Sequence, residues 1–291
     1  MKNISMLRKM KLFDYILIFI LSLYALIVIY PFYNSILVSF VSQSDYIMTP
    51  FMLFPKKIIF DSYIYVYKTG MLFSSMKITA IITIVGVIYN MLLTLLCAYV
   101  LSKPFPGRKF VAYLIVFTVY FTGGLIPNYL LIKDLHLVDN IFAMILPTGI
   151  TFMYMTVLRK SFESIPKSLE ESAKIDGAND ITILFRIVLP LSLPIIATFT
   201  LYYGVERWNE WWNGMLYIKS SRLQPLQLVL RNIIQEASTV SNGSGSSAMT
   251  QPFGDGIKMA STIISMLPIM MVYPFLQKFF ISGLVVGAVK E

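Results

Sequence analysis

The side chains that could carry chemistry gather in one stretch, residues 167–180, between two long apolar segments. The stretch holds six charged residues, Lys167, Glu170, Glu171, Lys174, Asp176 and Asp180. Its flanks hold almost none. The small residues Ser172 and Ala173 would let another surface come close to the backbone here. The stretch could be a functional contact surface or, more simply, a solvated loop helix of a membrane protein. Spacing alone does not separate these two interpretations.

Local signals predict two short helices joined by a corner. Pro166 suits a first helical turn, whereas Ser168 with Glu171 fits a capping box, so the two signals place the helix start slightly differently. Asp176-Gly177 should end this helix, because glycine tolerates the positive φ of a C-cap. Asn179 or Asp180 can then cap a second helix that runs into apolar residues.

No other group of residues fits a catalytic, metal or nucleotide site. The chain has one cysteine, Cys97, and one histidine, His136, so it offers no disulfide and no cysteine or histidine cluster. No carboxylate pair or Ser/His/Asp set sits where an intramembrane hydrolase would need it, and no Walker-type glycine loop is present. Basic residues are scattered and form no stripe for a nucleic acid. We therefore expect no enzyme, no bound cofactor or metal, and no nucleic acid partner.

The composition is that of an all-α membrane protein. Of 291 residues, 57% are hydrophobic and only 13% are charged, about half the charged share of a soluble domain. After a basic segment at 1–14, apolar runs predict six transmembrane helices, at about 15–40, 76–101, 111–131, 141–158, 187–205 and 259–276. Positive residues between the runs place both termini, and residues 164–186, in the cytoplasm.

Several of these spans carry residues that interrupt helices. Pro31 should bend or end the regular part of the first span, and Gly123-Gly124 in the third marks close packing or a break. As drawn, the span interiors contain no Asp, Glu, Arg or His, which counts against proton coupling and leaves a sodium site of backbone carbonyls as the alternative. Energy should therefore reach the chain from outside, through a docking surface, and residues 164–186 form the only cytoplasmic segment large enough for one.

The order Glu171-Ser172-Ala173, Gly177, Ile187 and Leu189-Pro190 resembles the EAA loop of permease subunits of ATP-binding-cassette importers. Ser172 in place of the usual first alanine is the one departure. The flanks Ile165-Pro166 and Leu169-Glu170 are similar to the carbohydrate-importer branch. The likeness covers nearly the whole chain and includes the segments 121–127, 208–209, 225–227, 273–275 and 287–290.

This resemblance implies a type I importer permease fold, as one half of a heterodimer in the bacterial cell membrane. It implies a partner permease, two ATPase subunits that bind ATP and Mg, an extracellular solute-binding protein and an oligosaccharide substrate. Residues 164–186 would be the coupling helices seated in the ATPase. The residues that match the coupling motif are Glu170, Glu171, Ser172, Ala173, Asp176, Gly177 and Ala178.

A sugar cavity needs aromatic platforms and neutral polar groups. Tyr202, Tyr203, Trp208 and Asn209, near the outer end of the fifth span, are the candidates, with lipid-interface or partner packing as the alternative. The external loop 206–256 includes a Ser/Gly-rich part, 238–256, expected to be flexible. The resemblance implies that its Ser244, Gly245 and Ser246 reach the binding protein, and a linker without a contact role is the alternative. A permease for another solute, or a membrane protein without a transport role, remain the alternatives.

Overall fold

The computed structural model describes residues 12–49, 52–242 and 253–288, and every regular element within these ranges is a helix. The chain divides into two units, each described here by itself. One contains residues from Met1–Thr69 and Ile233–Ile264, and the other contains residues from Gly70–Asn232 and Ser265–Glu291. The observed elements agree with the predicted all-α class.

Six spans result when bent helix pairs are counted as single spans. Three helical segments are long and apolar enough to cross a membrane as they stand: α1 (Leu12–Ser39), α4 (Met71–Ser102) and the Gly254–Val272 part of α15 (Gly254–Ala288). The other three are pairs broken within a few residues, Arg108–Tyr120 with Leu125–Asp134, Phe142–Thr148 with Phe152–Glu163, and Asp180–Leu191 with Leu193–Trp208. Their bends are 111°, 53° and 86°.

The breaks only partly follow the sequence signals. α5 (Arg108–Tyr120) and α6 (Leu125–Asp134) meet at Gly123-Gly124, as predicted, and Gly124 has φ +88°. Pro31, in contrast, lies inside α1, which continues to Ser39. The fourth span was expected to be one helix, but it divides into α7 (Phe142–Ile145) with η1 (Leu146–Thr148) and α8 (Phe152–Glu163).

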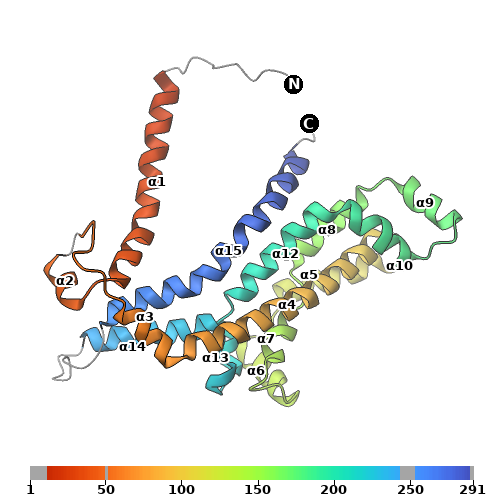
Figure 1. Ribbon diagram of the computed structural model, residues 1–291. Helices are drawn as coiled ribbons and strands as arrows, with labels where there is room; N and C mark the ends of the chain where they lie inside the picture. Colours follow the sequence, from red (N-terminus) through yellow and green to blue (C-terminus); the bar gives the residue numbers. More distant parts are fainter. Residues whose placement is uncertain (1–11, 50–51, 243–252, 289–291) are drawn as a thin grey trace. The chain divides into compact units, whose positions relative to one another are not determined.

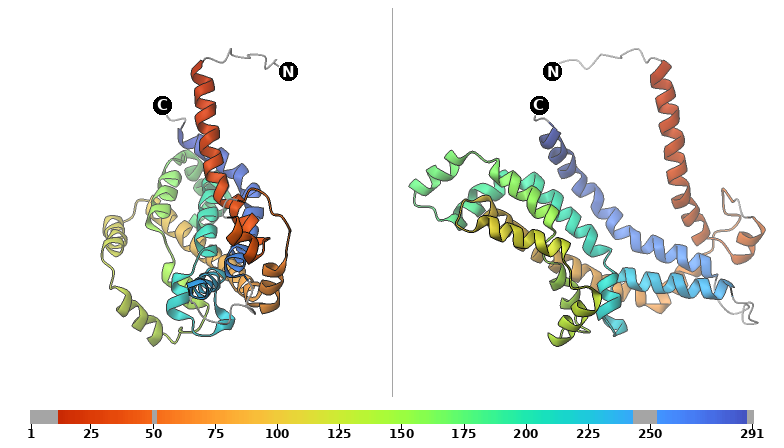
Figure 2. Two further views of the ribbon diagram at one scale, coloured as in Figure 1. Left: turned by 90° about the vertical axis from the view of Figure 1, so that its left-hand side faces the viewer. Right: turned by 180° about the vertical axis from the view of Figure 1, so that it is seen from behind.

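The larger unit is built on α4, α8 and α12 (Leu193–Trp208), which lie side by side (Figures 1 and 2). Buried residues from all three form one apolar cluster that includes Ala98, Leu158 and Phe199. The short helices α9 (Lys167–Ile175) and α10 (Asp180–Ile183) lie at one end of this bundle, and α6, α7 and α13 (Trp212–Tyr217) lie at the other (Figure 1). The polar stretch is therefore held at one extremity of a long apolar body.

The described part of the segment after α12 is mostly helical; of the predicted flexible part, 238–256, only its two ends are described, and residues 243–252 lie outside the described residues. The segment contains α13, η3 (Ser221–Leu223) and α14 (Leu226–Asn242), and α15 begins at Gly254. α14 has an apolar face at helical spacing, from Leu226 through Val229, that is buried. Ser244, Gly245 and Ser246 lie outside the described residues.

One carboxylate ties two connections at the end that carries α6 and α13. Asp139, between α6 and α7, has φ +63°, and its backbone N–H donates to the carbonyl of Tyr217 at 2.8 Å. Its Oδ1 accepts from the N–H of Lys219 (2.9 Å) and from the N–H and hydroxyl of Ser220 (2.8 and 2.9 Å). These bonds hold the pKa of the Asp139 carboxyl below its ordinary value, chiefly through the Ser220 N–H and hydroxyl.

In the smaller unit, the end of α1 packs on α3 (Asp61–Thr69). The Phe40 and Tyr63 rings stack with centroids 4.9 Å apart, and the hydroxyls of Ser39 and Tyr63 are 2.9 Å apart. α2 (Gln43–Met48) begins with a capped turn, in which Ser42 accepts from the N–H of Asp45. The start of α15 joins this unit, where the rings of Tyr46 and Phe253 are 5.3 Å apart.

Candidate functional site

The polar stretch folds as the predicted pair of short helices, α9 and α10. α9 begins at Lys167, directly after Pro166, whose φ of −56° presets the first turn. The predicted Ser168–Glu171 capping box is not formed, because Ser168 is already inside the helix and no side chain caps its start. The start of α9 is therefore set by proline geometry.

The corner between the two helices is a Schellman motif, which joins α9 to α10 through a fixed turn. Gly177, with φ +83°, donates its N–H to the carbonyl of Lys174 at 3.1 Å, and Ala178 donates to Ala173 at 2.9 Å. Asn179 then caps α10 by accepting from the N–H of Thr182 at 2.8 Å. The predicted break at Asp176-Gly177 is confirmed, and of the two possible caps the structure uses Asn179.

The motif residues of α9 divide between two faces. Glu170 forms an ion pair with Lys103, the residue that follows α4, and Ala173 and Ala178 pack against the buried cluster of the bundle. Glu171 and Ser172 are exposed on the other side. Of the two adjacent glutamates, one therefore fixes the helix to its own chain, and the other is exposed.

The outward side of the corner also carries exposed apolar residues. Ile175 at the end of α9 is 86% exposed, Ile181 in α10 is 69% exposed, and Leu169 is 44% exposed. Such residues beside charged ones are typical of a protein-binding surface. We call Leu169, Glu171, Ser172, Ile175 and Ile181 the docking face.

A buried anchor follows the docking face directly. Ile183, Leu184 and Val188 are at most 2% exposed and belong to the cluster formed with α4, α8 and α12. Leu184–Val188 is wound as a π-helix, and Leu189–Leu191 continues it to Ser192, where the chain bends by 86° into α12. The segment between the corner and α12 is thus fixed in the core through Ile183, Leu184 and Val188.

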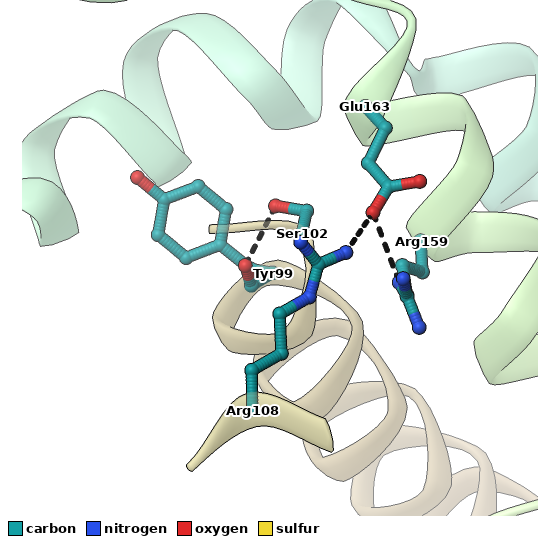
Figure 3. A network of polar contacts seen from close by, with 5 residues as sticks. All are labelled: Tyr99, Ser102, Arg108, Arg159 and Glu163. Atoms are coloured by element: carbon teal, nitrogen blue, oxygen red, sulfur yellow. Dashed lines mark hydrogen bonds and ion pairs between the residues drawn. The ribbon is translucent and has the colours of Figure 1, made fainter. Parts of the chain in front are cut away.

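Ion pairs fasten the neighbouring helix ends at the same extremity. Glu163, at the end of α8, accepts from Arg159 at 3.0 Å and also pairs with Arg108 at the start of α5 (Figure 3). The Ser102 hydroxyl donates to the carbonyl of Tyr99 at 2.7 Å, which closes the last turn of α4. Positive and negative side chains of α5 and α8 therefore meet at this extremity.

The candidates proposed for a sugar pathway occupy different environments. Tyr202 is 38% exposed, and its ring stacks on Tyr154 with centroids 5.7 Å apart. Tyr203 is only 1% exposed, and its hydroxyl is 2.8 Å from that of Thr94 and accepts from the N–H of Thr151 at 2.9 Å. Tyr203 thus has a structural role in this conformation, and a pathway role for Tyr202 stays a prediction.

Trp208 and Asn209 end α12. Trp208 lines an apolar cavity of about 500 Å³ formed by residues of α4, α12 and α15. The Trp208 Nε1 and the Oγ1 of Thr83, which also lines the cavity, have no hydrogen-bond partner among the described residues. Asn209 is exposed, and its amide donates to the carbonyl of Val205 and accepts from Gln227. Their substrate role stays a prediction.

The sequence interpretation missed a buried arginine. α12 continues past Val205 to Trp208, so Arg207 belongs to a spanning helix, where it is 4% exposed and contacts Asn90 of α4. The predicted end of the fifth span at Val205 was therefore too early, and the span interiors as drawn left out Glu206 and Arg207. The signal was available, because Arg207 lies four residues after Tyr203 on the same helix face.

Residues 107–286, which include the docking face and its anchor, match the family described as binding-protein-dependent transport system inner membrane component. The chain belongs to this family of transport permeases. It is accordingly a transport component and not an enzyme, and the alternative of a membrane protein without a transport role is wrong.

Relatives of this permease match it over nearly their full lengths. The polygalacturonan/rhamnogalacturonan transport system permease protein YtcP of Bacillus subtilis (strain 168) is 40% identical, with 97% of this chain and 99% of that protein covered. Protein LplC of the same organism is also 40% identical, with 96% and 95% covered. A crystal structure of a bacterial ABC transporter involved in the import of the acidic polysaccharide alginate aligns with a TM-score of 0.83, at 31% identity, and covers 92% of this chain and 96% of that chain.

Proposed function

We propose that this permease is the transmembrane subunit of an ATP-driven importer that moves an oligosaccharide across the bacterial cell membrane. The single observation that carries the proposal is the docking face, an exposed, rigidly anchored surface on a permease that has no nucleotide-binding loop of its own. Relatives named for saccharide transport support the substrate class. The partners would be a second permease, two ATPase subunits holding ATP and Mg, and an extracellular solute-binding protein.

The mechanism rests on how the docking face is joined to the spans. Glu171 would contact the ATPase while Ile175 and Ile181 bury apolar area in the same groove. When ATP closes the ATPase pair, the corner would move as one piece, because the Schellman motif and the buried Ile183, Leu184 and Val188 leave it no soft joint. That displacement would be delivered to the start of α12.

The substrate would meet neutral and aromatic groups on its path through the membrane. Tyr202 and Tyr154 present stacked rings, and Trp208 and Asn209 lie at the end of the same helix. Sugar rings have apolar faces that pack on aromatic side chains, and hydroxyls that bond to neutral polar groups. Ser244, Gly245 and Ser246 are proposed to reach the binding protein. A permease for a non-sugar solute would share the docking face and differ along this path.

The test is ATPase activity of the complex, purified in lipid with its binding protein, against acidic and neutral oligosaccharides. One saccharide class should stimulate hydrolysis, and Glu171→Lys should lower that stimulation by at least about tenfold through charge reversal at the interface. Because Glu171 is exposed, the variant should change folding stability by less than about 0.5 kcal/mol. Asp134→Lys, a charge reversal at an exposed residue at the end of α6, is the matched control and should leave stimulation unchanged.

The possible outcomes separate the parts of the proposal. Stimulation only by a non-sugar solute would contradict the substrate class and keep the coupling role. Wild-type stimulation that survives Glu171→Lys would contradict the assignment of the docking face. Failure of an ATPase to co-purify would overturn the proposal.

A further inference from the structure

The fourth span is interrupted between its two helical parts. α7 and η1 end at Thr148, α8 begins at Phe152, and the two parts meet at 53°. The last carbonyls of the first part and the first N–H groups of the second have no helical partner across such a break. Non-helical backbone in a bilayer is tolerated only where other protein groups bond to it. Other groups of the protein must therefore form hydrogen bonds with the free backbone carbonyls and N–H groups of residues 144–151.

Arg207 of α12 satisfies most of the carbonyls. Its Nη1 donates to Met144 at 2.7 Å, and its Nη2 donates to Thr148 at 2.9 Å and to Ile145 at 3.2 Å. These carbonyls form the C-terminal end of α7 and η1, which carries partial negative charge. The guanidinium thus acts as a cationic cap supplied by another helix.

Asn90 of α4 holds the guanidinium and reaches the break itself. Its Oδ1 accepts from Nε and Nη2 of Arg207 at 2.9 and 2.8 Å. Its Nδ2 donates to the carbonyl of Gly149 at 2.9 Å and also to that of Thr148. Asn90 is fully buried, so both halves of its amide are used in bonds inside the protein.

The other side of the break is closed from the same two helices. The N–H of Thr151 donates to the Tyr203 hydroxyl at 2.9 Å, which is itself 2.8 Å from the hydroxyl of Thr94. Arg207 and Tyr203 are one turn apart on α12, and Asn90 and Thr94 are one turn apart on α4. We call these four residues the clamp.

Glycines make room for the clamp. A Cβ on Gly86 of α4 would lie 3.0 Å from both Cδ and Nε of Arg207. A Cβ on Gly149, inside the break, would lie 3.0 Å from Cδ1 of Leu93. α4 therefore approaches both the guanidinium and the break as closely as its backbone allows.

The hydrogen bonds that the structure gives to Arg207 all go to neutral acceptors. No carboxylate forms an ion pair with Arg207 in the described part of the chain, and its acceptors are an amide oxygen and three backbone carbonyls. An arginine guanidinium stays protonated in proteins, so the clamp cannot serve as a proton relay. The arrangement instead suits a permanent mechanical joint.

We propose that Arg207 and Asn90 are positioning residues that transmit movement of the docking face to the outer half of the fourth span. α12 follows the anchored corner after the bend at Ser192 and then runs as one helix to Arg207, whereas α8 stops at the break before it reaches η1 and α7. The clamp joins α12 and α4 to α7 beyond that interruption. This inference rests on the proposed function, because it assumes that the docking face is the driven end.

The test uses the assembled complex in lipid and measures two quantities, basal ATPase activity and its stimulation by the loaded binding protein. Arg207→Met should keep basal hydrolysis and lower stimulation by about tenfold, the size of a typical coupling between sites. Hydrogen exchange at residues 149–152 should become faster in the same variant, because the break loses its bonds. Arg222→Met, the same change at an exposed residue of η3, should alter neither quantity.

Gly86→Ala keeps the test decisive if Arg207→Met does not fold. The added methyl displaces the guanidinium without removing its charge, so stimulation should fall while the complex still assembles. Gly204→Ala on α12, where nothing lies within 4 Å of the new Cβ, is its matched control. Asn90→Leu combined with Arg207→Met should lower stimulation little more than Arg207→Met alone, because both changes remove the same connection between α12, α4 and η1.

Different experimental results would contradict the inference and the proposed function. If the wild-type complex is not stimulated by any loaded binding protein, the proposed function is wrong. If wild type is stimulated and Gly86→Ala or Arg207→Met matches it while exchange at 149–152 rises, the clamp is structural only and the inference is overturned.

Discussion

The Asp139 carboxylate shows how much one side chain contributes when backbone donors converge on it. Its Oδ1 accepts three hydrogen bonds from Lys219 and Ser220, and its backbone, at φ +63°, donates to Tyr217. Ionised Asp139 accepts these bonds better than protonated Asp139, which is why its pKa is lowered. The tie between the two connections should therefore depend on pH.

Asp139→Asn should lower the melting temperature at neutral pH, because the amide accepts these donors more weakly than a carboxylate. A group whose folded pKa is depressed stabilises the fold above its ordinary pKa and loses that contribution as pH falls through the folded value. The difference in melting temperature between wild type and variant should thus disappear as pH falls below about 3.9. Asparagine tolerates the positive φ, so backbone strain is not the cause.

Thermal unfolding across this pH range is the measurement, with Asp134→Asn, a change at an exposed residue in the same region, as control. A difference in melting temperature that stays constant down to the lowest pH would show that the charge of Asp139 does not contribute to stability.

At the scale of elements, the corner between α9 and α10 depends on one left-handed residue. Gly177 has φ +83° and open space around its Cα, so a side chain there meets backbone strain and no steric clash. Gly177→Ala should cost about 1–2 kcal/mol of local stability. Gly177→Asn should cost less, because asparagine is the other common residue at this helix-end position.

The measurement is hydrogen exchange over residues 167–183, together with substrate-stimulated ATPase activity. Both should be perturbed more by the alanine than by the asparagine variant. Equal effects of the two variants would contradict the assignment of the corner to the Gly177 conformation.

At the scale of the whole molecule, the charge pattern predicts that the docking face is cytoplasmic. Lys103 pairs with Glu170 of α9, and the further basic residues Arg108, Arg159 and Lys160 lie at the start of α5 and near the end of α8. The chain has a single cysteine, so Cys97→Ser gives a background for site-specific labelling. In intact cells, an impermeant maleimide should label Asp134→Cys but label Glu171→Cys only after the membrane is opened.

Labelling of Glu171→Cys in intact cells would reverse the predicted orientation and would contradict cytoplasmic termini. Labelling of both positions would indicate a broken membrane, which a cytosolic cysteine protein in the same cells would reveal.

The sequence by itself determined the features that depend on neighbouring residues. Six apolar runs predict six spans, and Asp176-Gly177-Ala178-Asn179 encodes the corner, because capping and φ preferences act over a few residues. Gly123-Gly124 marks the break in the third span for the same reason. The sequence therefore suffices to predict a feature when the hydrogen bonds that form it join residues close together in the chain.

Only the tertiary structure decided which residues take which role. It separated Glu170, paired with Lys103, from exposed Glu171, and it placed Tyr203 in the core. It also revealed the break after Thr148, which the sequence interpretation missed although Pro147 and Gly149 stand on either side of that residue, and it showed that the bonds that satisfy the break come from Asn90 and Arg207. Those partners lie more than fifty residues away along the chain, so only packing of α4 and α12 brings them there.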